Sequence, residues 1–328
     1  QQQQQQQQQQ LLPETYPLPP HTFAGQIEQA LVAKYGTTAN IDRVLTSWRF
    51  MEQGYVHKEF VGDNNILDDP EHSKCHQLAH SYFPGLTVKE FWNPNDFFWS
   101  DKLRKGYSHI RRELEQNLSS MKWAGALTED AQAYGKGWKT LVLMNRGMWD
   151  VDNVKNLFPK TSNIVRQSGI PAVEVFFARL EAHSDSRWHS DFTSFVLTCH
   201  LGVIIPLPNE SCRLTIGDTE VAWENGQVLV FDTSILHKAI NESDHDRYIL
   251  MFRMWHPDLT NTERQALQFI YDALEFPGLL SLEKTERQEA ERAVQQARSF
   301  PLLLSGSTTT GGAGFGASST INKKKKTS

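Results

Sequence analysis

Two histidines and one aspartate in this 328-residue chain have the types and the spacing of a metal site. His189 and Asp191 are two residues apart, which places both side chains on one face of an extended segment. His237 stands at the end of a second apolar run, residues 231–236. Two imidazoles and a carboxylate on a β scaffold form the facial ligand set that suits non-haem Fe(II) and leaves coordination positions open.

Arg247 follows ten residues after His237 and opens a third apolar run. Its guanidinium presents a fork of donors that matches the carboxylate of a co-substrate. Each of these signals is weak when taken alone. A single histidine is more often a core or surface residue than a ligand, and a single arginine more often forms a surface ion pair.

The tripeptide H-S-D occurs twice, at residues 183–185 and 189–191, and a chain with twelve histidines is expected to contain about one H-x-D tripeptide by chance. The second copy lies between Trp188 and Phe192, directly before a predicted strand, so it can reach the mouth of a barrel. The first copy lies in a polar stretch that is typical of a loop. The context therefore favours the second copy.

The composition is that of an ordinary globular protein, with 39% hydrophobic and 22% charged residues and a net charge of −5. Without a basic stripe, it gives no reason to expect a nucleic-acid partner. No apolar run approaches the roughly 20 residues that span a bilayer, so no membrane anchor is visible. The chain begins with ten glutamines rather than methionine. Because no anchor is visible, we take the cytoplasm as the default location. Because the first residue is not methionine, the endoplasmic reticulum is the alternative if an anchor or signal lies upstream.

Cysteines and a second group of histidines leave two further alternatives open. The odd count of three cysteines argues against a disulfide scaffold, although Cys199 and Cys212 can still pair. His72, His76 and His80 are spaced four residues apart and share a face if their segment is helical. They can bind zinc or line a solvated or partly buried helical face. We favour the second interpretation because no second ligand pair lies nearby at zinc spacing.

The periodicity of apolar residues predicts a β core with flanking helices. Helices are predicted over residues 23–35, 41–53, 108–120 (with Ser108 as N-cap), 260–273 and 282–297. Strands are predicted over residues 138–144, 173–180, 195–206, 214–216, 221–223, 228–232 and 248–255. This pattern indicates a mainly β, α+β fold with a double-stranded β-helix core, also called a jelly roll or cupin-like barrel.

The same pattern divides the chain into regions. We expect a disordered glutamine- and proline-rich segment, a helical region, a jelly-roll domain, C-terminal helices and a disordered basic tail. Their boundaries are residues 1–20, 21–80, 81–260, 261–300 and 301–328.

Several sequence pieces carry a resemblance to a known family. They are H-L-G-V-I-I-P at residues 200–206, W-E-N-G-Q-V-L-V-F-D at 223–232, the run 247–260, and P-G-L-T at 84–87 followed by W-N-P at 92–94. Over residues 82–260 the chain resembles the aspartyl/asparaginyl β-hydroxylase family of Fe(II)/2-oxoglutarate-dependent oxygenases. The separation of the first two pieces makes the signal specific.

The resemblance implies Fe(II), 2-oxoglutarate and O2 as cofactor and co-substrates. In that family a histidine eleven residues before the H-L-G histidine binds iron, which selects His189 over His183. It also implies His237 as the second iron histidine, Arg247 as the partner of the distal carboxylate of 2-oxoglutarate, and His200 as a further co-substrate contact.

The chain departs from the best-known members at three positions. They have glycine where this chain has Asp191, which can complete a two-histidine, one-carboxylate set. They have arginine at the position of Thr198 and serine at that of Ala178, so two co-substrate contacts are lost or supplied from elsewhere. Arg179 and Arg213 are the candidates for the missing arginine. We expect a stronger iron site and a weaker 2-oxoglutarate site.

The function implied is a dioxygenase that hydroxylates an unactivated C–H bond, with an Asp or Asn side chain of a peptide or protein as the favoured target. Two alternatives remain. The jelly roll can have lost turnover and serve as a binding module, or the substrate can be a lipid or another small molecule.

Overall fold

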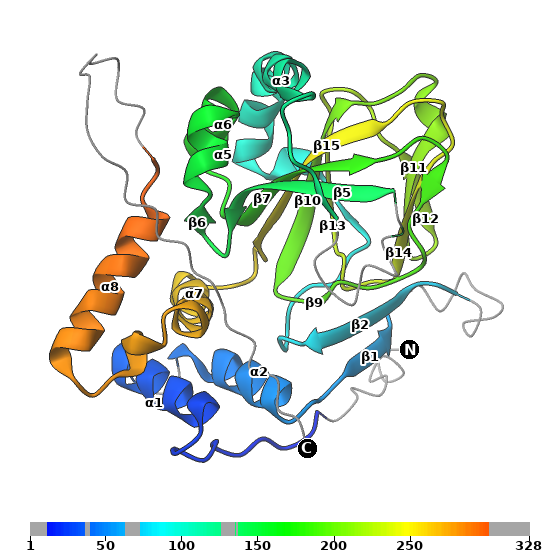
Figure 1. Cartoon of the computed structure of the whole chain (residues 1–328). Coiled ribbons are helices and arrows are strands. Elements are labelled where there is room, and N and C mark those ends of the chain that lie inside the picture. The colour runs from blue at the N-terminus through cyan, green and yellow to red at the C-terminus, as the bar shows by residue number, and fades with distance from the viewer. Residues whose placement is uncertain (1–11, 37–39, 63–72, 126–134, 136, 302–328) are drawn as a thin grey trace, which may run out of the picture.

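The structure, a computed structural model, describes residues 12–36, 40–62, 73–125, 135 and 137–301. Two sheets face each other and enclose the barrel interior (Figure 1). In the larger sheet the strand order is β3-β13-β10-β15-β7-β5-β4, and β6 pairs with β5. In the smaller sheet the order is β12-β11-β14-β8.

The chain alternates between these two sheets as it proceeds. The larger sheet takes β7 (Ala172–Leu180), β10 (Val196–Ile204), β13 (Val228–Phe231) and β15 (Arg247–Trp255). The smaller sheet takes β8 (Ser184–Asp185), β11 (Cys212–Ile216), β12 (Thr219–Ala222) and β14 (His237–Asn241). This antiparallel alternation of eight strands is a double-stranded β-helix, so the predicted fold class is confirmed.

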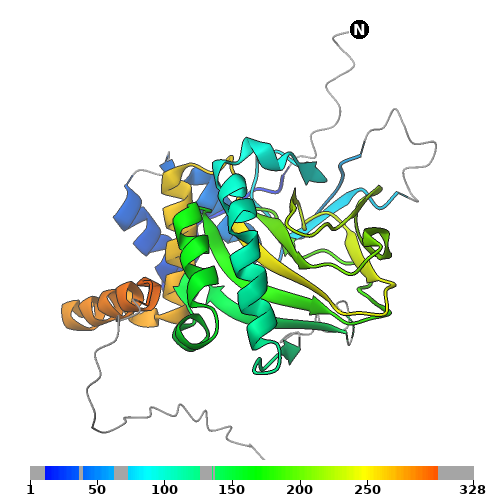
Figure 2. The same ribbon diagram turned by 90° about the horizontal axis from the view of Figure 1, so that it is seen from above.

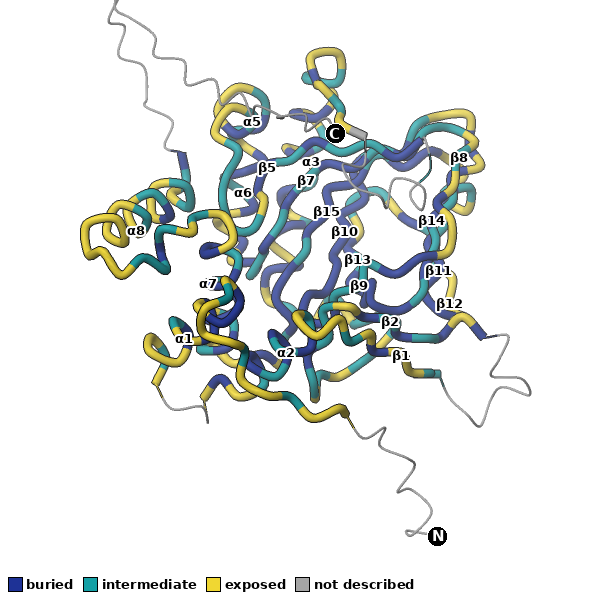
Figure 3. The backbone as a smooth tube through the Cα atoms, turned by 60° about the horizontal axis from the view of Figure 1, so that its bottom comes forward, coloured by how far each residue is buried: buried dark blue, intermediate teal, exposed yellow. Residues whose placement is uncertain are grey.

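Side chains alternate along each strand of the larger sheet, so its two faces pack into two different hydrophobic cores. On β10, Leu197, Cys199 and Leu201 pack into the core beneath the covering helices. Thr198 and His200 therefore point the other way, into the barrel. Almost every residue of β10 is buried because both of its faces are covered, as the dark strands of Figure 3 show.

Three helices cover the outer face of the larger sheet: α3 (Phe98–Asn117), α5 (Val151–Asn156) and α6 (Pro159–Ser168) (Figure 2). The carboxylate of Glu113 on α3 accepts hydrogen bonds from the backbone N–H groups of Lys160 and Thr161, at 3.0 and 2.7 Å. It thus stabilises the N-terminus of α6. The remaining strands of this sheet are β3 (Phe91–Trp92), β4 (Ala124–Gly125), β5 (Trp138–Asn145) and β6 (Met148–Trp149).

A second group of helices packs together beside the barrel: α1 (Phe23–Tyr35), α2 (Asp42–Glu52), α7 (Asn261–Glu275) and α8 (Lys284–Arg298). The helix α7 begins with a capping box between Thr260 and Glu263. Glu263 also accepts from Arg43 at 2.8 Å, which ties α2 to α7. In the described part of the chain, no helix combines the length and apolar character that a membrane crossing needs.

A small third sheet, β1-β2-β9, corrects one prediction. Residues His76–Ser81 form the strand β2 rather than a helix, and His72 lies outside the described residues. The strand β2 pairs with β1 (His57–Phe60) and, in parallel, with β9 (Phe192–Thr193). This pairing fixes the segment that directly follows Asp191.

One further prediction is wrong, and one alternative that the sequence left open is excluded. The helix predicted from Ser108 begins ten residues earlier, so Ser108 lies inside α3 and is not its N-cap. Cys199 and Cys212 do not pair, because all three cysteines are free and buried. The predicted helices 23–35 and 41–53 and the predicted strands 138–144, 173–180 and 248–255 are confirmed to within one or two residues.

Candidate metal and co-substrate site

Backbone hydrogen bonds between separate segments bring His189, Asp191 and His237 together. His189 and His237 exchange two backbone bonds, of 3.1 and 2.8 Å, as an antiparallel pair. The backbone N–H of Asp191 donates to the carbonyl of Thr233 at 2.8 Å. Ligand atoms of the three side chains lie within 4.8 Å of one another. Among the described residues, no other group of three histidine, cysteine or acidic side chains meets this condition.

Hydrogen bonds orient both rings of this cluster. The Nδ1 atoms of His189 and His237 lie 2.7 and 2.9 Å from the backbone carbonyls of Arg187 and Ile235, which accept from Nδ1–H. Each Nε2 lies 3.9 Å from Oδ1 of Asp191. That distance is too long for a direct hydrogen bond and leaves room for an ion among the three groups.

The cluster is largely buried, and this burial determines the protonation of His237. Burial lowers the pKa of His237 to about 4, against the smaller opposing effect of the Asp191 carboxylate. At neutral pH the imidazole of His237 is therefore neutral, which is the form that binds a metal ion. The three side chains together offer two imidazole nitrogens and one carboxylate oxygen as ligand atoms.

Deeper in the barrel, Arg247 is fully buried between two indole rings. The guanidinium carbon lies 4.4 Å from the ring centroid of Trp223 and 5.4 Å from that of Trp138. None of its three nitrogens has a hydrogen-bond partner among the described residues. Burial lowers the pKa of Arg247 to about 10, so it remains charged at neutral pH. A buried cation without a protein partner is costly, and an anionic ligand would offset that cost.

His200 adds a second donor at this end of the barrel. Its Nδ1 accepts from Nε1–H of Trp223 at 3.2 Å, so the other ring nitrogen, Nε2, carries the proton. This Nε2 is buried and has no hydrogen-bond partner among the described residues. Burial, and then the nearby charge of Arg247, lower the pKa of His200 well below its usual range.

A small cavity connects the cluster with His200. Its walls include His189, Asp191, His200, His237 and the ring of Trp138, which in turn contacts Arg247. Its volume is about 30 Å³, so a ligand larger than a few water molecules enters only when the lining side chains move.

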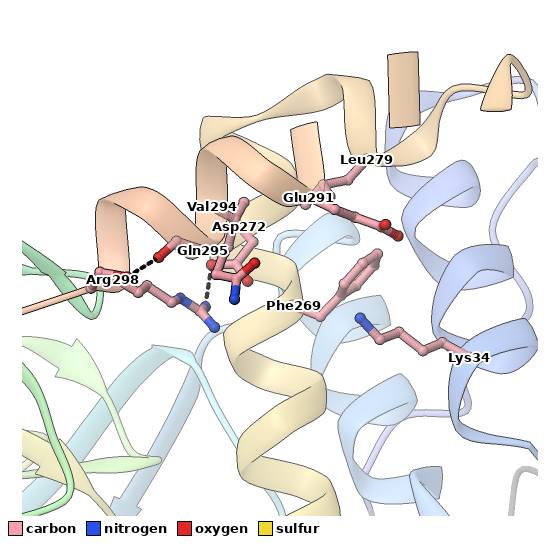
Figure 4. A pocket seen from close by; sticks show the side chains of 9 residues that line it. Lys34, Phe269, Asp272, Leu279, Glu291, Val294, Gln295 and Arg298 are labelled. Atoms are coloured by element: carbon pink, nitrogen blue, oxygen red, sulfur yellow. Dashed lines mark hydrogen bonds and ion pairs between the residues drawn. The ribbon is translucent and has the colours of Figure 1, made fainter. Parts of the chain in front are cut away.

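A larger cavity lies far from this cluster, among α1, α7 and α8, with a volume of about 400 Å³ (Figure 4). Lys34, Phe269 and Glu291 contribute to its walls. Its charged groups Asp272 and Arg298 pair with each other. It therefore lacks the combination that marks the barrel interior, which is a set of metal-ligand types beside a fully buried cation with no hydrogen-bond partner in the described part of the chain.

The other sequence candidates lie outside the cluster. His183, in the first H-x-D copy, is exposed and pairs with Asp244 at 2.9 Å. Arg179 pairs with Asp246 at 2.8 Å, and Arg213 pairs with Glu242 at 2.9 Å. Neither arginine contributes to the cavity wall next to the cluster.

Sequence reasoning missed Arg253, whose Nη1 lies 3.6 Å from Oδ2 of Asp191. Arg253 is the antiparallel partner of Thr198 on the neighbouring strand. Only the register of two strands distant in sequence could have identified it, because the residues around Arg253 carry no signal of their own.

Comparison with known proteins gives a consistent family match. The family model for aspartyl/asparaginyl beta-hydroxylase matches residues 104–257. The chain is 26% identical over 225 residues to the aspartyl/asparaginyl beta-hydroxylase of Homo sapiens, covering 62% of this chain and 29% of that protein. It is 29% identical over 160 residues to the ornithine lipid ester-linked acyl 2-hydroxylase of Rhizobium tropici, covering 47% of this chain and 56% of that protein.

Two further matches are a curated relative and a solved structure. A segment of 86 residues is 38% identical to the aspartate beta-hydroxylase domain-containing protein 2 of Homo sapiens, covering 25% of this chain and 22% of that protein. A solved prolyl hydroxylase from Trichoplax adhaerens, in complex with a hypoxia inducible factor peptide, aligns with a TM-score of 0.36 and 12% identity. That alignment covers 49% of this chain and 81% of the other, and the fold assignment above rests on the strand order instead.

Proposed function

The chain belongs to the aspartyl/asparaginyl β-hydroxylase family, and we propose that it is a dioxygenase that uses Fe(II), 2-oxoglutarate and O2 to hydroxylate an unactivated C–H bond. One observation carries the proposal. A buried His-Asp-His cluster shares the interior of one jelly roll with a fully buried arginine that has no hydrogen-bond partner among the described residues. These groups fit a metal ion and a diacid respectively.

The proposed roles follow from the contacts of each residue. His189, Asp191 and His237 would hold Fe(II), and the hydrogen bonds to the two Nδ1 atoms keep each Nε2 available to the ion. Arg247 would bind the far carboxylate of 2-oxoglutarate, and Nε2–H of His200 would donate to the same molecule.

Fe(II) and 2-oxoglutarate, when bound, supply the oxidising chemistry, and the protein fixes their geometry and limits the access of water. In the overall reaction one oxygen atom of O2 enters succinate and the other enters the new hydroxyl group. Decarboxylation of 2-oxoglutarate to succinate and CO2 provides two electrons, and the C–H bond provides the other two.

For the substrate we propose an Asp or Asn side chain in a peptide or protein, as the names of the human and mouse relatives indicate. The chain spans less than a third of the length of those two relatives, so their full activity does not transfer directly. A lipid acyl chain is the second candidate, because the relative from Rhizobium tropici is named as an acyl 2-hydroxylase of ornithine lipid.

The test measures succinate from purified protein supplied with Fe(II), 2-oxoglutarate and candidate peptides or lipids, together with the gain of one oxygen atom in the product mass. We expect His189→Ala and His237→Ala to abolish succinate formation and Asp191→Gly to retain part of it. His183→Ala, in the H-S-D tripeptide at residues 183–185, is the matched control and should retain full activity.

Two outcomes would redirect the proposal. Full turnover in both histidine variants would contradict the assignment of the metal ligands. Binding of 2-oxoglutarate by the wild-type protein without any succinate, across peptides and lipids, would favour the alternative of a binding module that has lost turnover.

A further inference from the structure

We infer that Arg253 is a positioning residue for Asp191: its guanidinium holds one carboxylate oxygen so that the other faces the two imidazoles. This inference rests on the proposed metal site and adds to it a residue that sequence reasoning did not identify. It concerns the orientation of the Asp191 carboxylate, and it does not depend on which substrate is hydroxylated.

The strand β15 brings Arg253 to the inner face of the barrel. Side chains alternate along a strand, so Arg247, Ile249, Met251 and Arg253 lie on one face. Ile249 and Met251 belong to the core of the barrel interior, which fixes the direction of this face. Arg247 stands at the buried end of the row, whereas the side chain of Arg253 is 18% exposed.

The two oxygens of Asp191 have different neighbours. Oδ1 lies 3.9 Å from Nε2 of both His189 and His237. Oδ2 lies 3.6 Å from Nη1 of Arg253. The carboxylate is therefore directed by a cation on one side and by two imidazoles on the other, as expected for a metal ligand that uses a single oxygen.

Burial favours a cation beside the Asp191 carboxylate. The side chain of Asp191 is only 3% exposed, and a buried carboxylate requires a nearby positive charge or strong hydrogen bonds. Glu174, the cross-strand neighbour of Arg253, has its Oε2 3.9 Å from Nε of the arginine. Glu174 thus limits the movement of the guanidinium on its other side.

The neighbouring strand supports the same arrangement. Thr198 lies opposite Arg253 in the ladder, and its Oγ1 is 3.0 Å from Oγ1 of Thr233. The backbone carbonyl of Thr233 accepts from the N–H of Asp191. Arg253 and the Thr198–Thr233 pair therefore constrain the side chain and the backbone of Asp191, respectively.

The experiment measures the affinity for Mn(II) alone, by the paramagnetic resonance signal of the free ion, without 2-oxoglutarate or substrate. Loss of a residue that orients a metal ligand weakens metal binding by about 10–100-fold. We expect that loss in Arg253→Gln and a smaller one in Arg253→Lys, which keeps the charge but not the planar fork. Arg179→Gln removes an ion-paired arginine elsewhere on the same sheet and should leave the affinity unchanged.

A double-variant comparison separates positioning from general destabilisation. In the Asp191→Gly background, Arg253→Gln should cause no further loss of Mn(II) affinity, because the carboxylate that it orients is gone. Arg253→Met keeps the length of the side chain and replaces the Gln variant if the latter fails to fold.

The inference and the proposed function can fail separately. Unchanged Mn(II) affinity in a folded Arg253→Gln or Arg253→Met protein would overturn the inference, even if the wild type forms succinate. An equal loss in the presence and absence of Asp191 would also overturn it. Weaker Mn(II) binding by the Arg253 variants, combined with a wild-type protein that forms no succinate, would support the positioning role of Arg253 and refute turnover.

Discussion

Replacing Arg247 by methionine should stabilise the ligand-free protein and abolish the binding of 2-oxoglutarate. The guanidinium is fully buried, and no hydrogen-bond partner for it lies among the described residues. Methionine has a similar length, no charge, and a flexible side chain that packs against the two indole rings. A residue kept for ligand binding at a cost to stability should behave in this way.

The magnitude follows from the pKa of Arg247, which burial lowers from 12.5 to about 10. This decrease corresponds to about 3 kcal/mol of unfavourable free energy for the charged form, at about 1.4 kcal/mol per pKa unit. A pH of 7 lies below both values, so the group is charged in the folded and unfolded chain and the whole cost is present. Loss of the contacts with Trp138 and Trp223 returns roughly 0.5–2 kcal/mol. We therefore expect a net gain of about 1–2 kcal/mol.

The assay is urea unfolding of the wild-type and Arg247→Met proteins, with and without 2-oxoglutarate. A ligand at about 100 times its Kd stabilises the wild type by about 2.7 kcal/mol and should leave the variant unchanged. Arg179→Met, on the neighbouring strand, removes an ion-paired and partly exposed arginine. It should shift stability by less than about 1 kcal/mol and retain the response to 2-oxoglutarate.

Two results would refute this reasoning. A clear loss of stability in Arg247→Met would mean that the guanidinium has a protein partner. A full response of the variant to 2-oxoglutarate would mean that the diacid binds elsewhere.

Three further predictions follow from buried groups. Burial raises the pKa of Asp232 to about 7, so the folded chain binds the proton more tightly and stability falls by up to about 4 kcal/mol as pH rises from about 4 to 7. This fall should be absent in Asp232→Asn when unfolding free energies are compared across that range. Trp223→Phe removes the hydrogen bond to His200 and should raise the KM for 2-oxoglutarate about 2–10-fold. All three cysteines are free and buried, so a thiol reagent should label them only after unfolding, and reductant should not change stability.

The jelly roll could be predicted from sequence because most of its strands are apolar runs bounded by turn residues. The strand β14 (His237–Asn241) was missed because its polar residues show no such run. The strand His76–Ser81 was misread as a helix because residues four apart share a face in a strand as well as in a helix.

The start of α3 was predicted wrongly for a different reason. Its N-cap, Phe97, makes no side-chain capping hydrogen bond, so no start signal precedes Phe98. Without that signal, the sequence predicts Ser108 as the N-cap of the helix.

The candidate site, like the fold, was predicted from the sequence only in part. His189, Asp191 and His237 were chosen from residue type, spacing and family resemblance, and local backbone pairing brings them together. The contact between Arg253 and Asp191 could not be anticipated, since it depends on the folding of β15 beside β10. A search of the sequence near Thr198 cannot identify Arg253, its cross-strand neighbour, which lies more than fifty residues later in the chain.

An experimental structure with Mn(II) and 2-oxoglutarate tests the central claim most directly, because manganese can be located by its anomalous scattering. The account predicts a single ion bound by Nε2 of His189, Nε2 of His237 and one oxygen of Asp191, with the far carboxylate of the diacid on Arg247. An ion bound by other residues, or a diacid that leaves Arg247 without a partner, would contradict it.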